Sequence, residues 1–247
     1  MKRLLFLSVF SISTPAFAID VCDTGCDYTS IGDALSVAQQ GDEIDVMAGT
    51  YHEYPAAVQE DVTITGEGAA STIVTTMSGA SPGPWLTIKS GVELQLEGIA
   101  IERDTLNFQK AFLFEPYSTG DLNDIKATGG FATGDGVLSM GAGSVVTIDH
   151  GFFMNNHGTA AGVIGVYSGD LTVIDSTFKE NSTDTSGGAI QATEMSTIDI
   201  HGTLFRANEA LDGGAIYVEN SDLILDVVEL KLNSATASGG AIYISNE

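Results

Sequence analysis

The sequence predicts an all-β protein, a parallel β-helix with about 26 residues per coil, because a fixed period in this range is typical of a solenoid, a propeller or an array. Two observations carry that prediction. Three copies of Gly-Gly-Ala-Ile end at Ile190, Ile216 and Ile242, so the step between copies is constant. Counting back with the same step reaches a large apolar residue every time: Leu86, Phe112, Leu138 and Ile164.

The content of each unit decides between these architectures. One unit has three short β-rich runs, at 189–192, 196–200 and 203–205, separated by Gly, Asn, Asp and Ser. Three runs per unit suit one coil of a parallel β-helix. A helical solenoid needs 3.6-residue periodicity, which the alternating run at 223–227 does not show. A propeller blade needs roughly 40 residues, so the units are too short for one.

The repeated residues therefore receive architectural roles. The column from Leu86 to Ile242 is predicted to be an interior ladder, since equivalent residues of neighbouring coils lie about 4.8 Å apart. A second interior column contains Phe153, Phe178, Phe205 and Leu230, and an asparagine follows each member by three residues: Asn156, Asn181, Asn208 and Asn233. Asn suits a sharp turn, and stacked amides can hydrogen-bond from coil to coil. The pairs Gly187-Gly188, Gly213-Gly214 and Gly239-Gly240 permit tight corners. An architectural role is favoured over a ligand site for these polar repeats.

Residues 1–18 are predicted to be a secretory signal peptide. A basic start, an apolar run over 4–12 and Ala16-Phe17-Ala18 form the usual pattern, with cleavage before Ile19. The apolar run is too short to cross a bilayer, and no later segment approaches the length of uncharged apolar sequence that a membrane span needs. A lipoprotein is disfavoured because Cys22 lacks a preceding small residue. We expect export to the periplasm, the cell surface or outer membrane, or the extracellular medium.

The charge restricts the partners. Without the signal peptide, 7 basic residues remain against 33 acidic ones, a net charge of −26. Such a surface repels nucleic acid and anionic membranes. The sequence has neither an Asp-x-Asp-x-Asp-Gly loop nor a Gly-Gly-x-Gly-x-Asp tandem, so we predict no metal and no cofactor. Cys22 and Cys26, the only cysteines, are expected to form a disulfide in an exported chain.

Residues 19–45 are predicted to cap the solenoid, which then occupies 46–247. Ser30 and Asp33 suit the N-cap and N3 positions of an amphipathic helix over 31–40, and Gly41 is placed to end it. Such a helix would cover the first coil. Strands are expected from Asp42 on, the first over 43–46.

Residues 75–135 are the least regular, and 103–109 and 115–124 are expected to bulge out of the coil. Trp85, Phe114 and Tyr117 are the aromatic binding candidates there, although packing over the ladder is the favoured interpretation. The sequence ends at Glu247 within a repeat and without a cap, which indicates either a fragment of a longer protein or a last coil that docks on something; we favour the fragment.

Two stretches resemble known families. The segments 26–35, 41–46, 49–51 and 62–66 resemble the opening of pectin-lyase-like right-handed β-helix proteins. The Phe-x-x-Asn and Gly-Gly-Ala-Ile copies after residue 150 are similar to the repeat of the polymorphic outer-membrane proteins, a family of bacterial adhesins. The resemblance implies a right-handed coil, which agrees with the hand of parallel crossovers. Those adhesins usually end in a membrane barrel, which is not seen in this sequence.

Many β-helices are carbohydrate lyases, hydrolases or esterases, so the sequence also bears on catalysis. The hydrolases of this fold carry Asn-Thr-Asp, Asp-Asp, Gly-His-Gly and Arg-Ile-Lys strings, and none occurs. Arg206 lies within a repeat and is expected at the surface, and His150, His157 and His201 are expected near corners rather than beside a carboxylate pair. The remaining catalytic candidates are Glu102, Arg103 and Asp104 with Asp149 and His150 two coils on.

The leading hypothesis is a secreted or surface-displayed β-helix used for adhesion or as a stalk. The alternative is a polysaccharide-active enzyme or a carbohydrate-binding relative of one, and a third possibility is a non-functional remnant of a longer gene. Expected partners are a cell-surface glycan or protein, and further repeats or an outer-membrane barrel on a longer parent chain.

Overall fold

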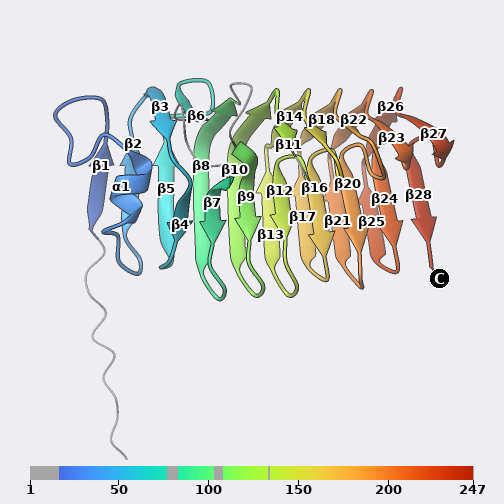
Figure 1. The fold of residues 1–247 in the computed structure, drawn as a ribbon, viewed down its shortest axis with the longest axis horizontal. Helices are drawn as coiled ribbons and strands as arrows, with labels where there is room; N and C mark the ends of the chain where they lie inside the picture. The colour runs from blue at the N-terminus through green and yellow to red at the C-terminus, as the bar shows by residue number, and fades with distance from the viewer. Residues whose placement is uncertain (1–16, 77–82, 103–107, 133, 247) are drawn as a thin grey trace, which may run out of the picture.

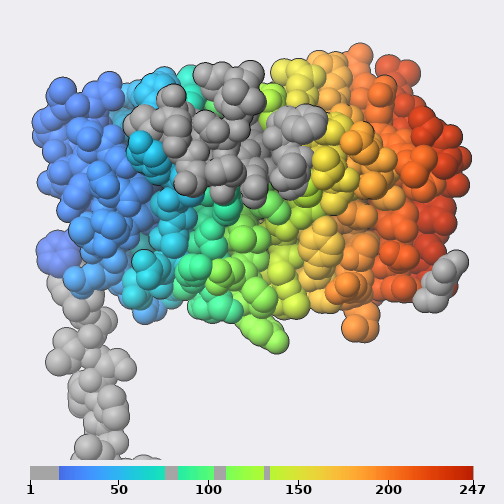
Figure 2. Space-filling model, in the orientation of Figure 1, coloured from blue at the N-terminus to red at the C-terminus, as the bar shows by residue number. Residues whose placement is uncertain are grey.

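The computed structural model describes residues 17–76, 83–102, 108–132 and 134–246. The chain winds through successive coils that stack along one axis from the N-terminus to the C-terminus (Figure 1). The space-filling view shows the same order as consecutive bands of colour along the long axis (Figure 2). All strand pairs between named strands of the described residues are parallel, as a β-helix requires.

Three sheets form the sides of the solenoid, and the largest, sheet A, has 15 strands. Its main path is β1 (Ala18–Val21), β2 (Glu43–Val46), β5 (Val62–Gly66), β8 (Glu93–Glu102), β10 (Thr119–Thr128), β13 (Val145–Asp149), β17 (Asp170–Ile174), β21 (Thr197–His201) and β25 (Asp222–Asp226). Attached to it are β3 (Gly49–Glu53), β6 (Thr72–Thr76), β14 (Phe152–Met154), β18 (Thr177–Lys179), β22 (Leu204–Arg206) and β26 (Glu229–Lys231).

The other two sheets complete each coil. Sheet B contains β4 (Ala56–Val58), β7 (Gly83–Ile88), β9 (Phe108–Phe114), β12 (Leu138–Met140), β16 (Ile164–Tyr167), β20 (Ile190–Thr193), β24 (Ile216–Glu219) and β28 (Ile242–Ser245). Sheet C contains β11 (Phe131–Ala132), β15 (His157–Gly158), β19 (Ser182–Thr183), β23 (Glu209–Asp212) and β27 (Ser234–Ser238).

The predicted interior ladder is confirmed along sheet B. Its seven members pair in order, from Leu86 with Phe112 to Ile216 with Ile242. All but Ile242 are fully buried. Each fully buried side chain of this size contributes about 1.5–3 kcal/mol relative to exposure. The repeat period in the sequence is therefore the length of one coil.

The second predicted column lies at the attached strands of sheet A. Phe153, Phe178 and Phe205 stack with ring centroids 4.9 Å apart, and Leu230 pairs with Phe205 at the end of the column. The members are unevenly spaced in the sequence, yet the strands stay in register because the turns absorb the difference. Their spacing in the fold matches the distance between neighbouring strands.

The two glycines of each Gly-Gly pair have different functions. The first, represented by Gly213 with a φ of 59°, adopts the left-handed backbone region that favours glycine. The second, represented by Gly214, has no positive φ, but a Cβ there would collide with the backbone carbonyl of Gly240 in the next coil. The pair therefore combines a corner in one coil with a close backbone approach from the next.

The asparagines form a hydrogen-bonded ladder. The side-chain amide and the backbone N–H of Asn181 both donate to Oδ1 of Asn208, at 3.0 and 3.1 Å, and the amide also donates to the Phe153 carbonyl at 3.1 Å. Asn156 and Asn208 repeat the arrangement with the next asparagine in line. Three of the four residues are fully buried, so the ladder satisfies polar groups that water does not reach.

The one described α-helix, α1 (Ile31–Leu35), contacts strands β1 to β4 and is shorter than the predicted capping helix over 31–40, so the predicted helical cap is not clearly formed. The Ser30 hydroxyl accepts a hydrogen bond from the Asp33 N–H at 3.2 Å, as the capping pattern predicts. The carboxylate of Glu53 accepts from the backbone N–H groups of Ile31 and Gly32, an interaction between distant segments that sequence did not reveal. Ile31 and Leu35 are buried against the first strands.

The start of the chain differs in part from expectation. Cys22 and Cys26 form a disulfide. Strand β1 precedes them and pairs with β2, so sheet A begins before the predicted first strand over 43–46. Most of the predicted signal peptide lies outside the described residues. Among the described residues, the one α-helix, α1, is far too short to span a bilayer.

The prediction of a bulge over 115–124 is wrong. A turn at Pro116–Tyr117 leads directly into β10, which pairs with β8 over nearly its whole length. Alternating buried residues such as Leu122 explain this, because they continue the inward face of sheet A. The predicted bulge over 103–109 lies largely outside the described residues. Trp85 and Phe114 are buried in the core, as the packing interpretation expected, whereas Tyr117 is exposed.

Candidate functional site

The outward side of sheet A is the candidate site, and we call it the sheet A face. Along each strand buried aliphatics alternate with outward polar residues, as Leu94 and Leu96 do with Glu93, Gln95 and Glu97. From β5 to β25 the strand register aligns the outward residues in three rows: Glu93, Thr119, Val145, Asp170, Thr197 and Asp222; Thr63, Gln95, Asp121, Thr147, Thr172, Asp199 and Ile224; and Thr65, Glu97, Asn123, Asp149, Ile174, His201 and Asp226.

The rows are strongly acidic. They contain eight carboxylates and neither Lys nor Arg. Cations align elsewhere, on the attached strands, where Lys179, Arg206 and Lys231 pair in register. Arg206 is exposed there, as its position in the repeat predicted. The sheet A face therefore presents hydrogen-bond acceptors and negative charge to a ligand.

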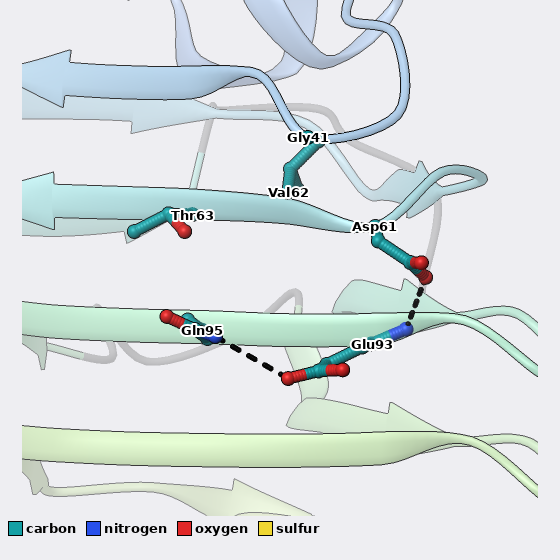
Figure 3. Close-up of a pocket in the computed structure, with 6 residues that line it drawn as sticks. All are labelled: Gly41, Asp61, Val62, Thr63, Glu93 and Gln95. Atoms are coloured by element: carbon teal, nitrogen blue, oxygen red, sulfur yellow. Dashed lines mark hydrogen bonds between the residues drawn. The ribbon is translucent and has the colours of Figure 1, made fainter. Parts of the chain in front are cut away.

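A shallow groove crosses this face near its N-terminal end. One depression of about 140 Å³ lies over β5 and β8, and its lining includes Gly41, Asp61, Thr63 and Gln95 (Figure 3). A second depression of about 180 Å³ shares Thr63 and Gln95 and continues to Asp149. Both depressions are lined by Thr63 and Gln95, so they adjoin, and we call the two together the groove.

Some polar groups of the groove are held by hydrogen bonds within the protein and others are not. Asp61 accepts from the backbone N–H of Glu93 at 2.8 Å, and the Gln95 amide donates to the Glu93 carboxylate at 3.3 Å (Figure 3). Within the described residues, the carboxylates of Glu97 and Asp121 form no hydrogen bond. They remain available to accept hydrogen bonds from a ligand.

The prediction that the histidines do not lie beside a carboxylate pair is wrong for His150, which is described below, and for His201. His201 Nε2 lies 2.8 Å from Asp199 Oδ1 and its Nδ1 lies 3.6 Å from Asp226 Oδ2. The hydrogen bond with Asp199, assisted by both negative charges, raises the pKa of His201 above its ordinary value. The parallel register places Asp226 of the next coil beside this histidine, which sequence spacing alone did not show.

The structure separates the predicted catalytic candidates. Glu102 aligns with Thr128 and forms an ion pair with Lys126 at 3.3 Å, whereas Asp149 aligns with Asn123. Gly98, with a φ of 68°, turns the chain between these two register positions. Glu102 and Asp149 thus lie on different sides of a corner. Arg103 and Asp104 lie outside the described residues.

Asp149 and His150 stay together, and a third potential ligand joins them. His150 Nδ1 lies 2.8 Å from Asp149 Oδ1, and ligand atoms of Asp149, His150 and Asp175 all lie within 4.8 Å of one another. His150 and Asp175 are exposed and occupy equivalent corners with positive φ. Among the described residues this is the group whose atoms would suit a cation, and its exposed position is that of an ordinary surface cluster.

A second polar cluster, on the opposite part of the coil, was not foreseen. Asp135 is buried and accepts from the Ser139 hydroxyl at 2.5 Å and the Tyr167 hydroxyl at 2.8 Å, with Lys110 Nζ at 3.5 Å. Burial, together with the charge of Asp135, raises the pKa of Tyr167. A Cβ at Gly165 would overlap the Asp135 carboxylate. Gly165, on strand β16 of sheet B, therefore leaves the space that the Asp135 carboxylate occupies. A glycine at this strand position was the one signal of the cluster in the sequence.

The fold and the sheet A face together define a solenoid protein with a polar lateral surface. The right handed beta helix region model matches residues 93–247. The chain belongs to this family, and its coil is right-handed. A comparison with curated proteins finds no matching sequence.

Several solved structures are similar in fold. A pectin methylesterase in complex with a hexasaccharide shares 11% sequence identity over 83% of this chain and 78% of that one, with a TM-score of 0.48. A pectin methylesterase from carrot shares 11% identity over 95% and 89%, with a TM-score of 0.47. PemA, a pectin methylesterase from Erwinia chrysanthemi, shares 10% identity over 87% and 80%, with a TM-score of 0.46. We draw no conclusion about activity from likenesses of this strength.

Proposed function

We propose that this protein is an exported, adhesive β-helix that binds a glycan chain along the sheet A face. The observation that carries the proposal is the groove that continues from Gly41 to Asp149 over successive coils. Its carboxylates accept hydrogen bonds, and its amides and hydroxyls both donate and accept, which suits the hydroxyl groups of a sugar. A repeating surface of this kind suits a repeating polymer.

The charge of the face limits the kind of glycan. Eight carboxylates without a Lys or Arg would repel a polyuronate such as pectin or alginate. A neutral glycan, or one that carries amino groups, avoids this repulsion. The ligand class is therefore a neutral or amino-bearing polysaccharide.

Export and adhesion draw support from the sequence. The basic and apolar start with Ala16-Phe17-Ala18 is typical of a signal peptide, and a disulfide between Cys22 and Cys26 suits an oxidising compartment. The Phe-x-x-Asn and Gly-Gly-Ala-Ile copies are similar to repeats of bacterial surface adhesins. A position at the cell surface follows from the proposed role.

A glycan array tests the proposal. The protein should bind neutral or amino-bearing glycans and leave them intact, and Asp121→Asn should weaken that binding about tenfold or more, the loss of one charged acceptor. Glu60→Gln is the matched control, because Glu60 is also exposed and acidic but lies outside the three rows. Binding only to polyuronates, or equal binding by both variants, would contradict the proposal.

A carbohydrate-active enzyme is the second candidate, and one observation favours it. Asp121 and Asp149 come from neighbouring strands and line the same part of the groove. Two carboxylates on either side of a glycosidic bond can divide acid and base roles. Turnover of a bound glycan that both Asp121→Asn and Asp149→Asn abolish would establish this function in place of simple adhesion.

A further inference from the structure

A separate pocket lies between α1 and the first strand of sheet B. Sheet B begins at β4, and α1 contacts this strand. The pocket has a volume of about 240 Å³, and its lining includes Asp33 of α1, Ala57 of β4, and Tyr54 and Gln59, which flank β4 in the sequence. We call it the α1 pocket. None of these residues lines the groove on the sheet A face, so the two sites are distinct.

The N-terminus of α1 is already satisfied from within the chain. The buried carboxylate of Glu53 accepts from the backbone N–H groups of Ile31 at 2.7 Å and Gly32 at 3.1 Å, and from the Ser30 hydroxyl at 3.0 Å. The Ser30 hydroxyl in turn accepts from the Asp33 N–H. These are the donors that the helix could have offered to an anion. An anionic ligand would also face the negative charge of Glu53, so the α1 pocket is unsuited to anions.

The free side chains of the pocket favour a cation. Asp33 is exposed, and within the described residues its carboxylate and the Gln59 side chain form no hydrogen bond. Tyr54 is 55% exposed, so its ring is open to a ligand. Neither Lys nor Arg is among the residues that line the pocket. A carboxylate and an amide oxygen accept hydrogen bonds, and the face of an aromatic ring attracts a positive charge.

The open edge of β4 supplies a further acceptor. The Val58 carbonyl accepts from the Lys89 N–H at 3.1 Å, so the backbone groups of Val58 point toward β7. Successive residues of a strand direct their backbone groups to opposite sides, so those of Ala57 point away from β7, to the side where α1 lies. Within the described part of the chain the Ala57 carbonyl accepts no hydrogen bond. It is an unpaired acceptor of the kind that an open strand edge presents.

We propose that the α1 pocket binds a primary organic ammonium group, as carried by an amino sugar, a diamine or a lysine side chain. Such a group has three N–H donors and no acceptor. The Asp33 carboxylate, the Ala57 carbonyl and the Gln59 amide oxygen supply acceptors, and the Tyr54 ring stabilises the charge. The volume lies below the roughly 300–1,000 Å³ that is usual for pockets of drug-sized ligands, so the site suits one small group.

An NMR titration of the full protein with n-butylammonium tests the proposal. The backbone amide signals of Asp33 and Ala57 should shift and saturate. n-Butanol, which is similar in size but uncharged, and potassium, which has the charge but no N–H donors, should not shift them. Titrations with D-glucosamine, 1,4-diaminobutane and Nα-acetyl-lysine amide then identify the source that binds most tightly. Equal shifts with n-butanol or potassium would overturn the proposal, as would the absence of saturable binding by n-butylammonium.

Variants assign the binding to the pocket. Asp33→Asn should lower the affinity for n-butylammonium about tenfold or more, and Tyr54→Leu should lower it about two- to fivefold. Asp23→Asn and Tyr117→Leu, matched changes at exposed residues outside the pocket, should bind normally. Normal binding by Asp33→Asn would contradict the proposal. Asp121→Asn should also bind n-butylammonium normally, so loss of glycan binding at the groove and loss of ammonium binding at the α1 pocket are told apart.

Discussion

The coils before Asn156, here the first half, and the coils from Asn156 to Asn233, the second half, share one interior. The side chains that hydrogen-bond to their turns differ. In the first half, carboxylates accept backbone N–H groups from other segments, as Glu53 does from Ile31 and Asp124 does from Ala69. In the second half, the turns from Asn156 to Asn233 use neutral amides in a continuous ladder. The first half is built from individual interactions and the second from a repeated one.

Hydrogen-bonding capacity explains the difference. An asparagine side chain both donates and accepts, so each one can pass a hydrogen bond to the next coil without interruption. An ionised carboxylate only accepts, and two of them stacked at the strand spacing would repel each other. Carboxylates therefore suit turns that occur once, whereas amides suit turns that recur with every coil.

The largest effect is expected in the amide ladder. Asn181→Ala removes the acceptor for two donors of Asn156 in a buried position, which should lower the free energy of unfolding by about 3 kcal/mol. Asn181→Asp should be no better, because a carboxylate cannot donate to the Phe153 carbonyl. Urea denaturation measures both.

Asn233→Ala is the matched control for the ladder. Asn233 lies in the last coil and is only partly buried, so water can replace part of its interaction with Asn208 and the cost should fall to about 1 kcal/mol. Equal costs at Asn181 and Asn233 would show that burial does not set the strength of the ladder.

A smaller effect is expected in the first half. Glu53→Gln keeps one acceptor oxygen for the N–H groups of Ile31 and Gly32 but removes the charge, which should cost about 1–2 kcal/mol. Because coils interact with their nearest neighbours, hydrogen exchange should rise around α1 and stay constant in the amide ladder. Glu60→Gln, also acidic but exposed, should change neither region. Faster exchange in the ladder would contradict the independence of the two halves.

The difference between an interaction that recurs in every coil and one that occurs once also explains which features the sequence could predict. The interior columns from Leu86 to Ile242 and from Phe153 to Leu230 were predictable, because a recurring residue in a solenoid must occupy a recurring position. The hydrogen bonds of Glu53 and Asp124 were not, since each occurs once and joins segments far apart in sequence. The predicted bulge over 115–124 was wrong because no repeated motif marks that segment. The alternation of buried and exposed residues along β10 was the only sign of a strand.

The candidate site was less predictable than the fold. A carboxylate's row on the sheet A face depends on strand register, and a corner such as Gly98 separates residues that are close in sequence. The predicted cluster around Glu102 and Asp149 ignored that corner. Asp149 beside Asp121, and His201 beside Asp226, follow only when neighbouring coils are aligned.

The smallest effect is expected at His201, which lies in the second half and contacts two carboxylates. Asp199 and Asp226 stabilise the imidazolium, so the pKa of His201 should lie above the ordinary value of about 6.5. A raised pKa means that the folded state binds the proton more tightly than the unfolded state. The stabilisation is therefore complete below the unfolded pKa and is lost as the pH rises through the folded value.

An NMR titration of the imidazole should show the raised pKa, and Asp199→Asn should lower it more than Asp226→Asn, because the contact with Asp199 is shorter. Since His201 is open to solvent, added salt should also bring its pKa back toward the ordinary value. A pKa that neither substitution moves would mean that these carboxylates do not act on the histidine in solution.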